Sequence, residues 1–184
     1  MTNISKPIVA TCIGIAISFC SVAKSFHSDS PTIKTDNQTM GTTQTASNKE
    51  AIRTLYTELL NHRHLDQLGT VIDDSYVGIQ GEKGPEGFKE TVGSIISAFS
   101  DIQWNIDDLI ADGNKVVVRW TWTGTFKHPF RGFSPTQKQL SNSAIGIYEF
   151  ANGKAVHAWL QSDQLGFLMQ IGVITPTIFN PTKK

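Results

Sequence analysis

Apolar residues in the first half of the chain recur at the three- and four-residue spacing of amphipathic helices. The sequence Ser-Asn-Lys-Glu at residues 47–50 has the form of a capping box, so we expect the first helix of the folded domain to begin at Ser47. A short second helix is expected over residues 65–72, and a short strand over residues 76–79. A third helix opens at GPEGF, and its apolar face holds Phe88, Val92, Ile95, Ile96 and Phe99.

After residue 101 the pattern changes to alternation of apolar and polar residues, which is typical of strands exposed on one face. The run with the strongest β propensity is VVVRWTWTGTF, which is rich in β-branched and aromatic residues. Asn152-Gly153 is the favoured two-residue hairpin turn, since both turn positions need a positive φ. Asp163 is placed to cap a last helix, and Gly172 to end it. The predicted strands cover residues 102–106, 116–126, 141–150 and 154–162.

Helices therefore come first and antiparallel strands follow, an order that predicts an α+β domain. A curved antiparallel sheet wrapped around the N-terminal helices would enclose an internal pocket, and such a pocket is a natural ligand site. Residues 124–138 (GTFKHPFRGFSPTQK) join two strands with far more residues than a hairpin needs. We expect this loop, which is rich in proline, glycine, cations and aromatic residues, to form the rim of the pocket.

The charge balance of the chain does not favour nucleic acid or an acidic membrane surface as a partner, because 16 Lys and Arg residues oppose 16 Asp and Glu residues. Both cysteines, Cys12 and Cys20, lie near the N-terminus, so the rest of the chain can form neither a disulfide nor a thiolate metal site. His62 and His64 stand two residues apart and do not share a helix face, so no metal site is predicted there.

The N-terminal segment has the composition of an export signal. Residues 7–23 are almost wholly apolar or small, and 17 residues is short for a spanning helix. We expect a signal peptide over residues 1–23 and a secreted or periplasmic protein; the alternatives are a membrane anchor over residues 7–23 and a lipid attached at Cys20. The predicted organisation continues with a disordered polar linker at 24–46, the folded domain at 47–174 and a C-terminal tail at 175–184.

Three segments are similar to segments of one protein family. GTFKHPFRGFSPTQK has a Gly-Thr start, a Phe-x-Gly centre and a Pro-Thr-x-Lys end; GPEGFKE opens the third helix; and NGKAVHAWLQSDQLGFLMQIG carries Asn-Gly-Lys, Trp159, Asp163 and a closing Gln-Ile-Gly. On these segments, residues 50–172 resemble the SnoaL-like polyketide cyclase or ester cyclase family, of the nuclear-transport-factor-2-like superfamily. The resemblance implies a cone-shaped fold with an internal pocket, and often a dimer formed through the sheet.

The resemblance also implies acid–base chemistry without a metal or a cofactor. In the cyclases of that family a pocket carboxylate removes a proton from a carbon between carbonyls, and an intramolecular aldol closure follows. Burial in an apolar pocket favours such a base, because it raises the pKa of a carboxyl group toward neutral pH. The chain departs from the family at three polar pocket positions, which hold Ile79, Phe126 and His157.

The predicted catalytic residues are Asp163 and His157, which share the parity of Trp159 on the last strand and should face the same side. They lie six residues apart, about 20 Å along an extended strand, so each would act on a different part of a bound molecule or only one would act. Asp163 can also serve as a helix N-cap, and His157 can instead belong to an exposed or dimer-forming sheet face.

Six residues are predicted to bind the ligand: Tyr76, Trp104, Arg119, Phe126, His128 and Trp159. Arg119 would pair with a carboxylate such as Glu149 across the sheet, or bind an anionic ligand. His128 stands near Lys127 and Arg131, and these potential cations would either attract a carboxylate or enolate or remain solvated.

Three hypotheses for the function are open at this stage. The chain is a cofactor-free cyclase or isomerase acting on a polyketide-like or carbonyl substrate, a non-catalytic protein that binds a small apolar ligand, or an interaction module that dimerises through its sheet face. Ile79 and Phe126 favour the second, because they make the pocket more apolar. Trp120 and Trp122 favour the third, since large aromatic residues suit interface cores. A homodimer is expected, with no cofactor and no metal.

Overall fold

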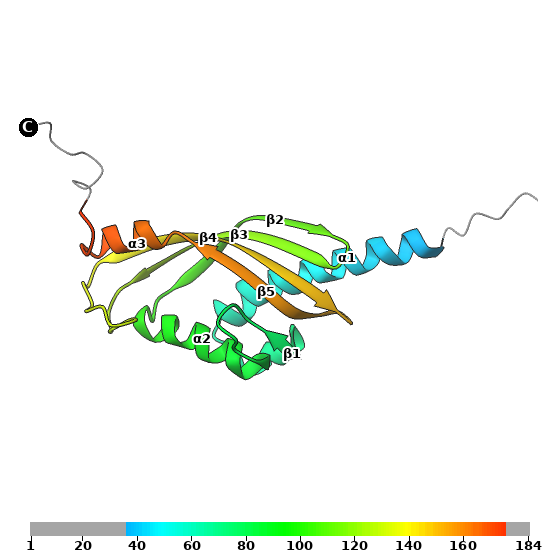
Figure 1. The fold of residues 1–184 in the computed structure, drawn as a ribbon, viewed down its shortest axis with the longest axis horizontal. Coiled ribbons are helices and arrows are strands. Elements are labelled where there is room, and N and C mark those ends of the chain that lie inside the picture. The colour runs from blue at the N-terminus through cyan, green and yellow to red at the C-terminus, as the bar shows by residue number, and fades with distance from the viewer. Residues whose placement is uncertain (1–35, 176–184) are drawn as a thin grey trace, which may run out of the picture. The chain divides into compact units, whose positions relative to one another are not determined.

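The computed structural model describes residues 36–175, with side chains described from residue 41 onward. Figure 1 shows a curved sheet with the helices α1 and α2 on one side of it. The helical segments are α1 (Asp36–Thr54), the π-helical η1 (Leu55–Leu60), the 3₁₀ helix η2 (Leu65–Thr70), α2 (Gly84–Ala98) and α3 (Gln164–Gln170). The strands are β1 (Ile72–Val77), β2 (Gln103–Asp112), β3 (Lys115–Thr125), β4 (Gln139–Ala151) and β5 (Lys154–Ser162). This is the α+β architecture that the order of the periodic segments predicts.

Several predictions about the chain ends lie outside the described residues. They are the signal peptide at residues 1–23, the first part of the linker at residues 24–35, and residues 176–184 of the tail. Within the part of the chain that the structure describes, no helix is both long and apolar enough to cross a membrane.

The first helix begins earlier than the sequence predicts. α1 begins at Asp36, so the expected start at Ser47 is wrong, and the described part of the predicted linker is helical. The Gln44 side chain donates to Asn48 Oδ1 one turn later, at 2.8 Å. The Thr45 hydroxyl lies 3.2 Å from the carbonyl oxygen of Gly113, which ties this part of α1 to the turn between β2 and β3. The local bond within the helix and the tertiary contact to Gly113 favour helix where the composition alone suggests a flexible linker.

The segment after η2 is a longer strand than the pattern predicts. Ile72, which we expected in the second helix, begins β1, and this strand ends at Val77 rather than Ile79. Pairing with β5 explains the difference, because Ile72 lies opposite Ala155 and Val77 opposite His157 in a parallel arrangement. β1 therefore carries Tyr76 onto the sheet, next to the start of α2.

The sheet is mixed and has the strand order β1-β5-β4-β3-β2. Strands β2 to β5 form antiparallel neighbours, as expected, whereas β1 pairs with β5 in parallel. Asn152 and Gly153 have φ angles of 51° and 81°, which confirms the predicted hairpin turn between β4 and β5. Gly172 follows α3 with a φ of 81°, as predicted for the residue that ends that helix.

Side chains of β3 and β4 alternate between an inner face, which the helices cover, and an outer face. Trp120 and Trp122 are 5% and 2% exposed and belong to the inner face. The hypothesis that these two residues form an open interaction surface is therefore wrong. The inner residues of both strands join the helices in one core, whose fully buried members include Ile52, Leu55, Phe99, Ile102 and Phe126.

Candidate functional site

A cavity of about 160 Å³ lies between the inner face of the sheet and the helical segments. Every tryptophan and every tyrosine of the chain lines it. The aromatic lining residues are Tyr56, Tyr76, Phe88, Trp104, Trp120, Trp122, Phe130, Tyr148, Trp159 and Phe167. The others are Leu60, Ile79, Gln80, Glu82, Thr91, Val92, Ser94, Ile95, Arg131, Asn142, Ala158, Leu160, Ser162 and Gln164. An aromatic cavity with so few charged groups favours a planar, largely apolar ligand.

Three of the predicted ligand-binding residues, Tyr76, Trp104 and Trp159, line this cavity. Trp104 is fixed by Asn61, whose amide donates to the Trp104 carbonyl oxygen and accepts from its backbone N–H, both at 2.8 Å. Asn61 thus gives an edge residue of the sheet the pair of hydrogen bonds that a neighbouring strand would otherwise provide. The Tyr76 ring packs edge-on against Phe88 of α2, with centroids 5.8 Å apart.

Three buried polar side chains, one each from η1, β3 and β4, are joined by hydrogen bonds in the wall of the cavity. Trp120 Nε1 donates to the Tyr56 hydroxyl oxygen at 2.9 Å, and the hydroxyl oxygens of Tyr56 and Tyr148 lie 2.8 Å apart. Burial raises the pKa of both tyrosines, because the charged phenolate would lose its hydration. Both hydroxyls therefore remain protonated, and remain hydrogen-bond donors, across the neutral pH range.

Two further polar side chains in the cavity lack protein partners. The Oδ1 atom of Asn142 is buried and accepts no hydrogen bond within residues 41–175. The Tyr76 hydroxyl makes no hydrogen bond with the described residues, and burial raises the pKa of Tyr76. A buried polar atom without a partner, such as Asn142 Oδ1, is costly in a finished core and is expected where a ligand or water completes the site.

The loop over residues 124–138 contributes to the cavity through its central turn. Phe130 and Phe133 exchange backbone hydrogen bonds of 3.1 and 2.9 Å around Arg131 and Gly132, whose φ angles are 50° and 83°. The backbone N–H of Lys127 donates to Ala98 at the end of α2, at 2.9 Å. Phe130 and Arg131 line the cavity, so the central turn forms part of its wall, as expected of the loop.

Two loop residues predicted to bind the ligand do not line the cavity. Phe126 is fully buried in the core and stacks on Phe99 with centroids 5.0 Å apart. His128 is exposed to solvent, and neighbouring Lys127 lies 3.9 Å from Asp101 in an ion pair. Of Lys127, His128 and Arg131, which were expected at the pocket, only Arg131 lines the cavity.

Asp163 caps α3, which is one of the two roles that the sequence allows. Its Oδ1 atom accepts from the Gly166 backbone N–H at 2.7 Å, and the side chain is exposed. Asp163 itself does not line the cavity, although its neighbours Ser162 and Gln164 do. The carboxylate that does line the cavity is Glu82, in the loop before α2.

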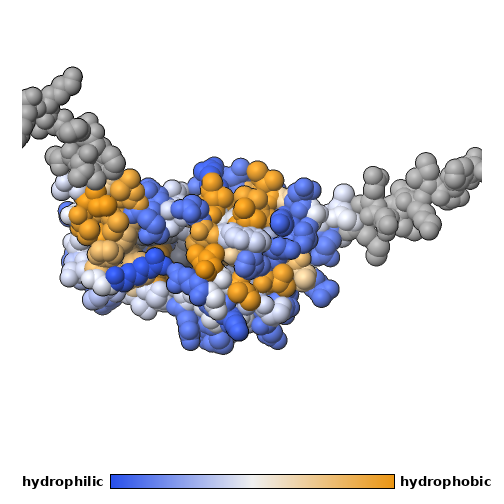
Figure 2. Space-filling model, viewed as in Figure 1, coloured by the Kyte–Doolittle hydropathy of each residue, from blue (hydrophilic) through white to orange (hydrophobic). Residues whose placement is uncertain are grey.

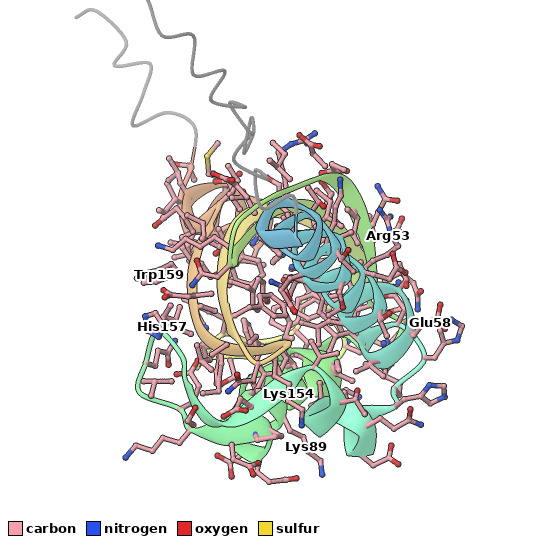
Figure 3. The ribbon with its side chains drawn as sticks, turned by 90° about the vertical axis from the view of Figure 1, so that its right-hand side faces the viewer. Arg53, Glu58, Lys89, Lys154, His157 and Trp159 are labelled. Carbon is pink, nitrogen blue, oxygen red and sulfur yellow. The ribbon has the colours of Figure 1, made fainter. Side chains whose placement is uncertain are left out.

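Alternation along β5 was expected to place His157 and Trp159 on the inner face of the sheet, and the structure places them on the outer face. Ala158, Leu160 and Ser162 line the cavity, whereas His157 and Trp159 point away from the interior (Figure 3). The register of β5 shifts between Ala155 and His157, a bulge that changes which residues face inward. The His157 ring donates from Nδ1 to the Val77 carbonyl oxygen, and Trp159, at the open edge of β5, still borders the cavity.

Arg119 does not reach the cavity. It lies on the outer face of β3 and forms an ion pair with Asp107, at 3.1 Å, rather than with Glu149. Asp107 stands at a register shift in β2, and it also accepts from the Thr121 hydroxyl at 2.8 Å. Arg119 thus has the structural role that the sequence offers as one alternative, with a different partner.

The sequence reasoning missed the polar groups at the two ends of the cavity. Tyr148 and Asn142 lie on the inner face of β4, and their shared parity with buried Leu140 and Ala144 could have placed them there. Tyr56 could have been found from its position among buried helix residues. Among the side chains of residues 41–175, no three His, Cys, Asp or Glu residues gather as a metal site.

Three solved structures illustrate the likeness of this fold to known proteins. TsrD from Streptomyces laurentii is 24% identical, with a TM-score of 0.66 over 70% of this chain and 97% of TsrD. A protein from Acidithiobacillus ferrooxidans is 28% identical, with a TM-score of 0.62 over 70% of this chain and 96% of its own. A SnoaL-like polyketide cyclase from Agrobacterium tumefaciens is 22% identical, with a TM-score of 0.60 over 66% and 95%.

A comparison with curated protein sequences found no match. A family model described as SnoaL-like polyketide cyclase matches residues 50–171, which span the domain from the end of α1 through α3. The strand order, the helices on the inner face and the aromatic cavity are all contained in that range. The chain therefore belongs to the SnoaL-like polyketide cyclase family.

Proposed function

We propose that this protein takes a small planar carbonyl compound into its aromatic cavity and catalyses a cofactor-free proton transfer on it, as a cyclase or isomerase. The observation that carries the proposal is a cavity lined by ten aromatic side chains in a chain of the SnoaL-like family. Its volume of about 160 Å³ is close to that of an apolar cavity known to hold benzene. The size therefore favours a compound with one or two rings.

The chemistry requires one base. A carboxylate removes a proton from the carbon beside a carbonyl group, and the electron pair of that C–H bond moves onto the carbonyl oxygen as an enolate. The enolate carbon then either regains a proton, which completes an isomerisation, or attacks a second carbonyl, whose oxygen takes up the proton. Glu82 is the carboxylate that lines the cavity, so we assign it as the base.

Hydrogen–deuterium exchange tests the proposal without knowledge of the natural substrate. The probe is 2-acetylnaphthalene, whose methyl protons exchange through its enolate, and exchange in D₂O is followed by NMR. We expect the wild type to accelerate exchange and Glu82→Gln to lower that acceleration by about 100-fold or more, the usual contribution of a general base. If Asp163→Asn, rather than Glu82→Gln, abolishes exchange, the base is the residue that the sequence predicts. Absence of acceleration by the wild type would contradict the proposed reaction.

Binding without catalysis is the second candidate, and the composition of the cavity favours it. Glu82 and Arg131 are the only charged residues among those that line the cavity, so its wall offers mainly apolar and aromatic contacts. Ala158→Trp fills the cavity from β5 and should abolish ligand binding in either case. Saturable binding that Ala158→Trp removes, without accelerated exchange, would establish the binding function alone.

We also propose that a second copy of the chain packs on the outer face of the sheet. One row of apolar side chains crosses four strands of that face, and Ile110 and Trp159 at its two ends are 58% and 42% exposed. The row consists of Ile110, Val117, Ile147 and Trp159, each paired with the next across neighbouring strands. An apolar row of this kind suits the centre of an interface with a polar rim.

The neighbouring row makes this face complementary to itself. It consists of Asp112, Lys115, Glu149 and His157, again paired from strand to strand. A two-fold axis parallel to the strands, between β3 and β4, would place β2 opposite the partner's β5 and β3 opposite the partner's β4. Lys115 then faces Glu149 of the partner subunit, and Asp112 faces the partner's His157. The same axis keeps the strand directions of the two sheets aligned, as in face-to-face sheet packing.

Sedimentation tests this dimer. Ile147→Lys should give a monomer, whereas Thr123→Lys, on the outer face away from the apolar row, should leave the dimer intact. Lys115→Glu should weaken the dimer through repulsion by the partner's Glu149, and the double variant Lys115→Glu, Glu149→Lys should restore it. A wild type that stays monomeric at high concentration would remove the proposal.

Export is the remaining proposal, and the N-terminal composition alone supports it. We propose that residues 1–23 direct secretion and are removed after Ala23. Mass spectrometry of protein purified from its own source should find a mature chain that begins at Lys24. An intact chain in the membrane fraction would support the anchor instead.

A further inference from the structure

Tyr56 and Tyr148 form a hydroxyl pair inside the cavity, which we call the tyrosine pair. Tyr56 comes from η1 and Tyr148 from β4, and Trp120 on β3 supplies the third group of the hydrogen-bonded chain. The three side chains are at most 5% exposed, and all three line the cavity. The pair is therefore reached from the cavity and from no other side.

A count of donor hydrogens shows that the hydrogen bonding of these three side chains is incomplete. Trp120 Nε1 can only donate, and each tyrosine hydroxyl has one hydrogen to donate, so the three groups hold three donor hydrogens. They form two hydrogen bonds, one from Trp120 to Tyr56 and one between the tyrosines. One hydroxyl hydrogen is left over, whichever way the bond between the tyrosines runs.

No acceptor within the described residues takes this hydrogen. Neither tyrosine hydroxyl makes any hydrogen bond with residues 41–175 besides the two already given. The unpaired Asn142 Oδ1 lies on the same strand as Tyr148, but the two residues are six positions apart, about 20 Å along β4. The leftover hydrogen therefore points toward the cavity.

We propose that the tyrosine pair is a binding site for an acceptor oxygen, either the carbonyl or the enolate oxygen of a planar ligand in the cavity. The inference rests on the proposed function and goes further, because it assigns the group that holds the oxygen. Trp120 donates to the Tyr56 oxygen and cannot accept, so one hydroxyl hydrogen of the pair stays available to the ligand in either direction of the bond between the tyrosines. The pair is buried among aromatic rings, and a hydrogen bond in such surroundings discriminates strongly for an acceptor.

The pair suits an enolate as well as a neutral ketone. Burial disfavours the ionised form of both tyrosines, so the pair donates its hydrogen without giving it up at neutral pH. As negative charge develops on the ligand oxygen, the hydrogen bond from a preorganised donor strengthens. Glu82 would then remove the proton, and the tyrosine pair would stabilise the oxygen on which the charge accumulates.

A pair of ligands of the same shape tests the site. The first is 2-acetylnaphthalene, and the second is 2-isopropenylnaphthalene, in which a CH₂ group replaces the carbonyl oxygen. The measured quantity is the ratio of the two dissociation constants, found by titration for the wild type and for each variant. We expect Tyr56→Phe with Tyr148→Phe to lower the preference for the ketone by about 5- to 10-fold, as one lost hydrogen bond implies.

Single variants distinguish this site from a merely structural network. Tyr148→Phe leaves Trp120 bonded to Tyr56 and frees the Tyr56 hydrogen, and Tyr56→Phe leaves the Tyr148 hydrogen free. Each single variant therefore still holds one free donor, and we expect each to keep part of the preference that the double variant loses. Tyr76→Phe is the comparison variant, because Tyr76 lines the same cavity and its hydroxyl is the competing donor for the ligand oxygen. The inference assigns the oxygen to the tyrosine pair, so the preference should fall much less in Tyr76→Phe than in the double variant.

The infrared C=O stretch of the bound ketone gives a readout independent of affinity. It should lie at lower frequency in the wild type and in Tyr76→Phe than in the double variant. Equal affinities of the wild type for both ligands, or a preference lost only in Tyr76→Phe, would overturn the inference and leave the proposed binding function intact. If neither ligand binds the wild type, both proposals fail.

Discussion

Alkaline pH should unfold this protein steeply, because every tyrosine of the chain is buried. Tyr56, Tyr76 and Tyr148 are 3%, 3% and 4% exposed, and burial raises the pKa of each above its ordinary value of 10.0. The unfolded chain releases these protons near pH 10, whereas the folded chain keeps them. The stability that they contribute is therefore fully present below about pH 10 and falls as the pH rises toward the pKa of the folded state.

The magnitude follows from proton linkage. Each tyrosine that ionises only on unfolding lowers the free energy of unfolding by about 1.4 kcal/mol for each pH unit above 10, and three lower it by about 4 kcal/mol. A domain of ordinary stability has about 5–15 kcal/mol in total. About one to four pH units above 10 should therefore suffice to unfold the protein.

Urea denaturation from about pH 9 to about pH 11 measures this slope, since both limits bracket the ordinary tyrosine pKa. Tyr76→Phe is the most informative variant, because the Tyr76 hydroxyl makes no hydrogen bond whose loss would confuse the result. It should reduce the tyrosine part of the slope by one third, while the lysine contributions stay the same as in the wild type. Tyrosinate absorbance should rise together with the loss of circular dichroism. A rise in absorbance near pH 10 in protein that stays folded would refute the reasoning.

Substitutions at three further residues test the roles that the structure assigns outside the cavity. Phe126→Ala should cost about 3–5 kcal/mol in urea denaturation, as expected for a fully buried core residue, and a cost below about 1 kcal/mol would contradict its place in the core. Asp163→Ala should cost about 1 kcal/mol and Asp163→Asn much less, because asparagine also caps helices; equal costs would argue against the cap. Asp101 accepts from the Thr125 hydroxyl and backbone N–H, which lowers its pKa. Its contribution is present above the ordinary value of 3.8 and lost as the pH falls toward the folded-state pKa, so Asp101→Asn should flatten the acid limb of the stability curve, and an unchanged limb would contradict this.

Local chemistry made most of the fold predictable. The alternation in β3 and β4, the Asn152-Gly153 turn and the end of α3 at Gly172 follow from rules that act over a few residues, and the structure confirms them. The start of α1 and the extent of β1 were mispredicted, because both depend on contacts distant in sequence. α1 reaches Gly113 through Thr45, and β1 exists by pairing with β5.

The site was less predictable than the fold for a related reason. A bulge in β5 reverses the faces that parity predicts for His157 and Trp159, and nothing in the alternation of that strand reveals it. The family resemblance implies a pocket position for Phe126, but stacking on Phe99 places it in the core. The tyrosine pair joins two residues 92 positions apart, a contact that no local pattern contains.

Apolar patches on the surface can also adsorb the hydrophobic ligands used in these tests. The face seen in Figure 2 shows orange hydrophobic patches with blue hydrophilic residues between them, so apolar probes have more than one surface to contact. Specific binding in the cavity must therefore be separated from adsorption on such patches. Loss of binding in Ala158→Trp provides that separation, because Ala158 is buried and lines the cavity.

The most direct measurement is a crystal structure of the protein grown with saturating 2-acetylnaphthalene. We expect the rings to lie in the cavity between α2 and β5, with the ketone oxygen within hydrogen-bonding distance of the hydroxyl of Tyr56 or Tyr148. A ligand bound elsewhere, or a ketone oxygen turned away from both hydroxyls, would contradict the central claim that this cavity receives a carbonyl compound by its oxygen.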